Sequence, residues 1–142
     1  MTREHAETYD IILIDAFSQW GPADVNHDKP FILNCQSLLN NQGIIGFSLW
    51  NRKEDQFHTI HRRMCSLFNE NLLSLSLGKR DSNVVLFGFK NDYPLKNIRA
   101  AEMRAARLLL DWGINFPNYM KLIQIQNLSL LKNIKKHFSV TL

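Results

Sequence analysis

The chain has 142 residues, of which 45% are hydrophobic and 21% are charged. These fractions are typical of a globular domain and exclude a disordered or fibrous protein. The formal net charge is +4, from 17 Lys and Arg against 13 Asp and Glu. The basic residues after residue 90 are dispersed along the sequence, which favours a solvated helix face and predicts no nucleic-acid partner.

The cysteines and the apolar runs predict the compartment. Cys35 and Cys65 each lie in an apolar helical pattern without the spacing of a metal site, so both are expected to be buried, reduced thiols. The first residues contain no apolar signal segment, and no stretch approaches the 18 or more apolar residues of a membrane span. We therefore expect a cytoplasmic protein that has no contact with a membrane.

The first predicted elements are a strand, a loop and a helix. Residues 11–14 form a short β-branched run that is typical of a strand buried on both faces of a parallel sheet. Residues 15–22 are expected to leave this strand as a loop. A helix then begins near Asn26 or Asp28, carries Pro30 in its first turn and ends in a turn over residues 40–43.

A second buried strand is predicted over residues 44–50, at a distance that implies a right-handed parallel crossover. Residues 54–68 show helical spacing of apolar positions. The strands predicted over residues 72–77 and 84–89 are joined too closely for a crossover helix, so they are expected to form an antiparallel hairpin at the far edge of the sheet.

Two further helices are predicted near the end of the chain, over residues 98–110 and 118–137, with a turn at residues 113–117 between them. The whole pattern predicts an α/β fold. The expected architecture resembles the C-terminal half of the Rossmann-like fold of class I S-adenosylmethionine-dependent methyltransferases, in which parallel strands end in an antiparallel hairpin and are flanked by helices. We expect one partial domain over residues 1–142, with the sheet and crossover helices at about 9–90 and the C-terminal helices at about 95–140.

Four segments carry a resemblance to a family. Residues 9–23, Y-D-I-I-L-I-D-A-F-S-Q-W-G-P-A, resemble without a gap the spermidine synthase motif Y-D-x-I-x-x-D-x-x-D-P-x-G-P-A. Residues 39–50 resemble L-x-P-G-G-x-x-x-x-N-L-W, residues 83–90 resemble the end of G-N-x-x-x-F-A-F-[KR], and residues 114–117 resemble L-D-F-P. The resemblance to the spermidine synthase-like family covers nearly the whole chain.

This resemblance implies aminopropyl transfer from decarboxylated S-adenosylmethionine to a small amine such as putrescine. Asp15 matches the carboxylate that acts as the base, and Asp15 and Ala16 match positions beside the cofactor. Asp15 also follows a predicted parallel strand, where open α/β sheets place ligands. The alternative is that Asp15 only caps the loop by accepting N–H groups of Phe17 or Ser18.

The resemblance also places Ser18, Gln19, Trp20 and Trp50 at the acceptor amine, but two of these residues depart from the family. Ser18 stands where the family has a second Asp, and Gln19 stands where it has Pro. A hydroxyl does not neutralise a buried ammonium group, so a diamine is expected to bind poorly. Trp20 and Trp50 either line the acceptor pocket or serve as core or lid residues.

The sequence contains no G-x-G, although cofactor binding in this fold relies on a Gly-rich turn after the first strand. We therefore expect no cofactor bound by this chain alone, and no activity without the missing half. Three hypotheses remain open: an aminopropyltransferase, a methyltransferase-like protein that uses S-adenosylmethionine, and a non-catalytic subunit or remnant. The bare strand at residues 11–14 predicts a partner, either a second copy or a chain that carries the first half of the sheet.

Other constellations are weaker. His58 and His61 lie three residues apart on a predicted helix, but no third ligand has suitable spacing, so a solvated face is favoured and no metal is predicted. No Ser or Cys has the context of a catalytic triad, which argues against a hydrolase.

Overall fold

A computed structural model describes residues 8–19, 21–23, 25, 28–50, 54–69, 71–76, 78, 83–91 and 98–127 of the chain. The chain divides into two compact units, Met1–Asp92 and Tyr93–Leu142, and each is described by itself.

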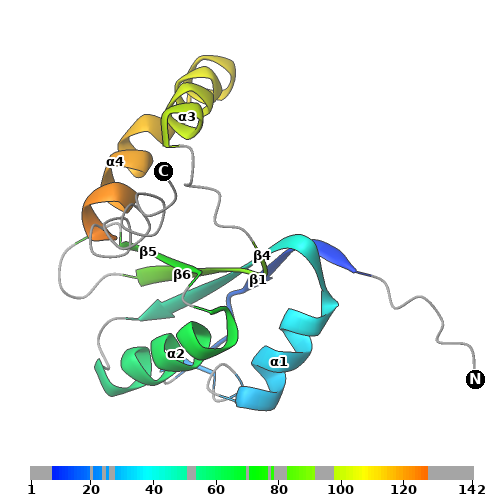
Figure 1. Ribbon diagram of the computed structural model, residues 1–142. Coiled ribbons are helices and arrows are strands. Elements are labelled where there is room, and N and C mark those ends of the chain that lie inside the picture. Colours follow the sequence, from blue (N-terminus) through cyan, green and yellow to red (C-terminus); the bar gives the residue numbers. More distant parts are fainter. Residues whose placement is uncertain are drawn as a thin grey trace, which may run out of the picture. The chain divides into compact units, whose positions relative to one another are not determined.

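The described part of the first unit contains a four-stranded sheet with the strand order β1-β4-β6-β5. Strands β1 and β4 are parallel, whereas β6 is antiparallel to both of its neighbours. The helices α1 and α2 link the strands (Figure 1). The bounds of these elements are Tyr9–Ile14 for β1, Lys29–Leu38 for α1, Leu39–Trp50 for β4, Glu54–Leu67 for α2, Leu72–Ser76 for β5 and Asn83–Phe89 for β6. This arrangement confirms the predicted α/β fold and is that of one half of a Rossmann-like fold.

The last strand of the described residues, β6, lies inside the sheet. Strand β6 pairs with β4 on one side and with β5 on the other, so β5 runs parallel to β1 and β4 at the edge. The hairpin at the far edge is therefore confirmed, with its second strand inserted between its first strand and β4. Its first strand ends at Ser76, close to the predicted end, and its second begins at Asn83.

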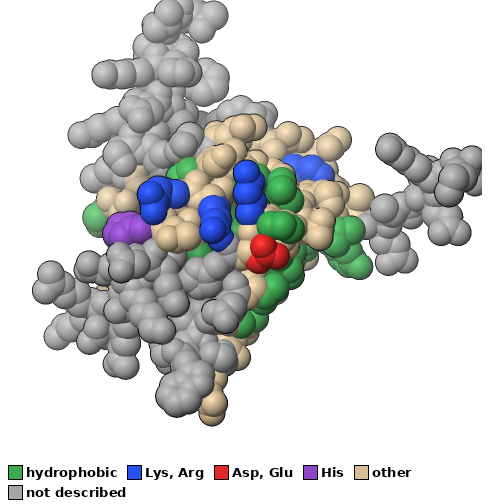
Figure 2. Space-filling view, turned by 90° about the horizontal axis from the view of Figure 1, so that it is seen from below, with side chains coloured by type: hydrophobic (Ala, Val, Ile, Leu, Met, Phe, Trp, Pro, Cys, Tyr) green, Lys and Arg blue, Asp and Glu red, His purple; other side chains and the backbone are tan. Residues whose placement is uncertain are grey.

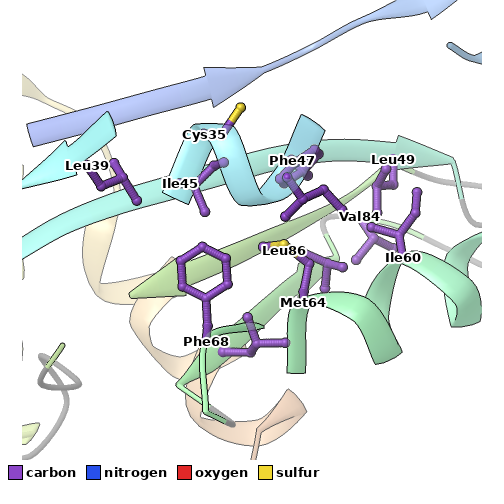
Figure 3. Packing of buried hydrophobic residues seen from close by; sticks show 12 residues of the cluster. Cys35, Leu39, Ile45, Phe47, Leu49, Ile60, Met64, Phe68, Val84 and Leu86 are labelled. Atoms are coloured by element: carbon purple, nitrogen blue, oxygen red, sulfur yellow. The ribbon is translucent and has the colours of Figure 1, made fainter. Parts of the chain in front are cut away.

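The core lies between the sheet and the two helices, which cover the same face. Alternate residues of β4 point to this face, where Ile45, Phe47 and Leu49 are almost fully buried. Helix α1 contributes Ile32, and α2 contributes Ile60 among others. Figure 3 shows side chains of β4, β6 and α2 packed against one another, among them Phe47, Leu86 and Ile60. Each such side chain stabilises the fold by about 1.5–3 kcal/mol relative to exposure, so this cluster holds the helices on the sheet.

The start of β4 differs from the prediction. Residues 40–43 were expected to be a turn that ends the helix, but β4 already begins at Leu39, which pairs with Tyr9. The next pair is Ile11 with Ile44, so residues 40–43 form an irregularity within the strand. Gly43 allows it, because a Cβ there would lie 2.8 Å from the Leu39 Cβ and 3.0 Å from the backbone oxygen of Tyr9.

The start of α1 agrees with the prediction in part. Asp28 occupies the N-cap position with extended backbone angles, and Pro30 lies in the first turn. The Asp28 side chain makes no capping hydrogen bond, so the helix begins here without the stabilisation of a side-chain cap.

The described part of the second unit is a pair of helices, α3 (Ile98–Trp112) and α4 (Phe116–Gln126). Gly113 adopts a φ of 69°, which ends α3, and the Asn115 side chain accepts a hydrogen bond from the backbone N–H of Asn118 at 3.2 Å. The helix predicted over residues 118–137 thus begins earlier, and its part beyond residue 127 lies outside the described residues. Among the described residues, no helix has the length and apolar character needed to cross a membrane.

Candidate functional site

The candidate site lies at the carboxyl ends of β1 and β4. These strands are parallel and adjacent, so Asp15, which directly follows β1, emerges at the same edge of the sheet as Trp50, the last residue of β4. Open α/β sheets bind their ligands at this edge. The topology therefore places Asp15 at the carboxyl end of the parallel pair.

The loop after Asp15 is a small hairpin rather than an irregular segment. Strands β2 (Phe17–Ser18) and β3 (Gly21–Pro22) pair antiparallel, and the backbone N–H of Ala23 donates to the backbone oxygen of Ala16 at 2.9 Å. Main-chain pairing thus orders this loop. The Asp15 side chain is exposed to solvent, so its carboxylate is accessible to a ligand.

The structure brings together several of the residues that were singled out from the sequence. Asp15 and half-buried Ala16 precede the hairpin, and exposed Gln19 lies in its turn. Ser18 lies in β2 and Trp50 in β4, but their side chains, like the whole of Trp20, lie outside the described part of the structure. Their predicted contacts with an acceptor remain predictions.

One further polar residue lies at this edge. Asn83, the first residue of β6, is exposed and pairs with Trp50 because β6 runs antiparallel to β4. From the sequence, Asn83 was only the first residue of the motif at residues 83–90 and had no predicted role. The predicted antiparallel hairpin is the signal that could have located Asn83. If β6 runs antiparallel to β4, the first residue of β6 lies opposite the last residue of β4.

The histidines of α2 form no metal site among the described residues, where no group of three or more His, Cys, Asp and Glu side chains converges. The ring of Phe57 lies 5.7 Å from that of His58 and 5.8 Å from that of His61, centre to centre. His61 also places its Nδ1 3.6 Å from the Sγ of Cys65. His61 therefore contacts Phe57 and Cys65, two residues of the same helix.

Neither cysteine forms a disulfide, and Cys35 is buried as predicted while Cys65 is half-buried. Burial raises the pKa of the Cys35 thiol above its ordinary value of 9.0, and its hydrogen bond with backbone only partly opposes this effect. Because the thiolate is the nucleophilic form, Cys35 is a core residue and not a catalytic one.

Comparison with known proteins finds a relative with a named activity. The chain is 28% identical over 109 residues to a polyamine aminopropyltransferase of Lachnospira eligens. The alignment covers 72% of this chain, whereas the chain spans only 38% of that protein's length. No family model matches the chain.

Proposed function

We propose that this chain carries the acceptor side of an aminopropyltransferase active site, with Asp15 as the general base. The observation that carries the proposal is the exposed Asp15 carboxylate at the end of a parallel strand, followed by a loop that main-chain pairing orders. The similarity to a polyamine aminopropyltransferase supports the same reaction class.

The chemistry requires a carboxylate at this place. The unprotonated nitrogen of an amine attacks the carbon next to the sulfonium of decarboxylated S-adenosylmethionine, so that a C–N bond forms while the C–S bond breaks. The electron pair of the broken bond stays on sulfur, and methylthioadenosine leaves. The nitrogen loses its proton to Asp15, a transfer that contributes about 10²–10⁴-fold to the rate when the base is well placed.

In this proposal, the acceptor amine carries less positive charge than a polyamine does. Ser18 stands where the family has its second carboxylate, so the site lacks the charge that would hold a distal ammonium. Trp20, Trp50 and Gln19 would form the walls around the nearer amine. The same substitution favours a second candidate, methyl transfer from S-adenosylmethionine to an uncharged acceptor.

The co-substrate is held by polypeptide other than these 142 residues. The sequence has no G-x-G turn, so Asp15 and Ala16 would form only one side of the co-substrate site. The chain alone is therefore expected to be inactive.

The partner surface in this proposal is the outer edge of β1. The side chains of Tyr9, Ile11 and Leu13 are 47%, 60% and 72% exposed on this edge strand. A polypeptide that carries the preceding strands of the sheet would pair a parallel strand with the backbone of β1, and its other elements would cover these side chains on the face opposite the core. Sedimentation of the purified chain tests whether β1 is left for such a polypeptide. A dimer that pairs through β1 would replace the proposed partner with a second copy of the chain. A stable monomer would leave the edge of β1 open for the proposed partner.

The test of activity is a chimera in which this chain replaces the segment of the Lachnospira eligens enzyme to which it aligns. We expect the chimera to transfer the aminopropyl group and Asp15→Asn to lower turnover at least about 100-fold, because the base is lost. Asp28→Asn is the matched control, since Asp28 is also exposed and its side chain makes no capping hydrogen bond. Equal turnover of Asp15→Asn and the unmodified chimera would exclude Asp15 as the base.

The acceptor is tested by Ser18→Asp in the same chimera. Restoring the second carboxylate is expected to lower the KM for putrescine by about tenfold or more, since a buried ammonium group without a partner costs about 3–5 kcal/mol. If the unmodified chimera methylates an uncharged acceptor and transfers no aminopropyl group, the second candidate replaces the first.

A further inference from the structure

A groove of about 360 Å³ lies on the outer side of the two helices that cover the sheet. Its lining comes from the first residue of α1 and from one side of α2. Figure 2 shows Lys and Arg side chains gathered on the face that carries these helices. The lining residues are Lys29, Thr59, Arg62, Arg63 and Ser66.

The α2 residues of the groove lie on one stripe because of their spacing. Positions 59, 62, 63 and 66 follow the three- and four-residue steps that place side chains on the same face of a helix. The opposite face of α2 carries Ile60 and Met64, which are buried in the core. The packing of the core therefore fixes the polar stripe on the outside.

The walls of the groove are held relative to each other. Ile32 of α1 and Ile60 of α2 belong to the same buried cluster. The side-chain amide of Gln36 donates a hydrogen bond to the backbone oxygen of Leu67, which ties the end of α1 to the end of α2. The two helices that carry the lining are thus fixed relative to each other before a ligand binds, and only the exposed side chains would have to be ordered.

The groove presents hydrogen-bond donors and positive charge. Lys29 and Arg62 are exposed and Arg63 is half-buried, and the Nε of Arg62 donates to the backbone oxygen of His58 at 3.4 Å. The terminal nitrogens of a guanidinium carry four further N–H donors in a planar fork that matches phosphate oxygens. The exposed carboxylate of Asp28 precedes Lys29 in the chain and offsets part of the charge.

We propose that this groove binds the phosphate group of a small phosphorylated molecule. Two guanidinium groups, one ammonium group and two hydroxyl-bearing side chains converge on it, and a phosphate supplies several acceptor oxygens for them. Its volume is at the lower end of the roughly 300–1,000 Å³ of ligand pockets, which suits a small molecule rather than a long polyanion. The site shares no residue with the proposed acceptor site.

Isothermal titration of the purified chain with pyrophosphate and with inorganic phosphate tests the proposal. We expect saturable binding of pyrophosphate, and binding weakened by about tenfold or more in Arg62→Gln/Arg63→Gln, because two charge-assisted contacts are lost. The matched control is Arg99→Gln/Arg104→Gln, which removes the same charge from exposed positions of α3 and is expected to bind as the unmodified chain does. Thermal melting of each variant shows whether it is folded.

Arg62→Lys/Arg63→Lys separates a fork-shaped site from diffuse attraction, since it keeps the charge and loses the planar geometry. We expect this variant to bind more weakly than the unmodified chain. Equal weakening by the α2 and α3 glutamine variants would overturn the proposal, as would the absence of saturable pyrophosphate binding. Binding of inorganic phosphate alone would assign the groove to the free ion, and binding of an oligonucleotide without pyrophosphate would assign it to nucleic acid. Either outcome also overturns the proposal.

Discussion

At the amino ends of β1 and β4, polar side chains bond to one another, whereas at the carboxyl ends of the same two strands the Asp15 carboxylate is exposed. At the amino ends, the Asn40 side-chain amide donates to the carboxylate of Asp10, and the Asn40 side-chain oxygen accepts from the backbone N–H of Gln42 at 2.8 Å. Lys90 donates from its side chain to the backbone oxygen of Leu39. One end of the parallel pair thus engages its polar groups in hydrogen bonds, and the other leaves a carboxylate exposed to solvent.

The largest effect on stability is expected at Gly43, in the crowded amino edge. Gly43→Ala would place a Cβ 2.8 Å from the Leu39 Cβ and 3.0 Å from the Tyr9 backbone oxygen, which costs about 1–3 kcal/mol of unfolding free energy. Gly46→Ala is the control, because its Cβ would meet the Cδ2 of Leu13, whose side chain is exposed and can move. Urea unfolding measures both, and equal losses would contradict the crowding at Gly43.

Removing the Lys90 ammonium group should have the next largest effect. Lys90→Met leaves the Leu39 backbone oxygen without this donor and is expected to cost about 1.5 kcal/mol, the lower end for a hydrogen bond to a charged group. Lys121→Met, at an exposed position of α4, is expected to change the unfolding free energy by less than about 0.5 kcal/mol. If the unfolding free energy of Lys90→Met equals that of the unmodified chain, the Lys90 ammonium group does not stabilise this end of the sheet.

The two aspartates at opposite ends of β1 compare the edges directly. Asp10→Ala removes the acceptor of the Asn40 amide and is expected to lower the unfolding free energy by about 0.5–1 kcal/mol. Asp15→Ala removes an exposed carboxylate and should change it by less than about 0.5 kcal/mol. A larger loss at Asp15 than at Asp10 would assign Asp15 a structural role and weaken its proposed role as a base.

The smallest effect is a pH dependence from the buried thiol of α1. Because burial raises the pKa of Cys35, the unfolded chain loses this proton first as the pH rises through 9.0. Stability from this thiol is therefore complete below pH 9.0 and falls as the pH rises from there through the higher pKa of the folded state. Cys35→Ala should reduce this loss of unfolding free energy at high pH, which urea midpoints on both sides of pH 9.0 would detect. An unchanged dependence of the midpoint on pH in Cys35→Ala would contradict the prediction.

Much of the fold was predictable because apolar runs are read directly from the sequence. The run at residues 11–14 predicted β1, and the short linker after residue 77 predicted the antiparallel hairpin. The irregularity at residues 40–43 was not predictable, since Asn, Gln and Gly are typical of a turn and only the pairing of Tyr9 with Leu39 extends the strand.

The candidate site was predictable in part. Asp15 followed from its position after a buried strand together with the motif. Asn83 was given no role because its place depends on the register of β6 against β4, a contact between residues far apart in the sequence. The helix face with His58 and His61 was interpreted as solvated, and the groove beside it was not predictable, since one of its lining residues, Lys29, comes from another helix.

The position of β6 inside the sheet also bears on the order in which the chain can fold. Strand β5 is made before β6, yet its partner in the sheet is β6, so β5 has no ladder to join when it is synthesised. The residues of β1 and β4 both precede β5 in the chain, so their ladder is the one that needs no later strand. The seven residues of β6 then close both remaining ladders in one step. A chain truncated before Asn83 would therefore leave β4 and β5 without the partner that both share, and such unpaired strands are prone to aggregation.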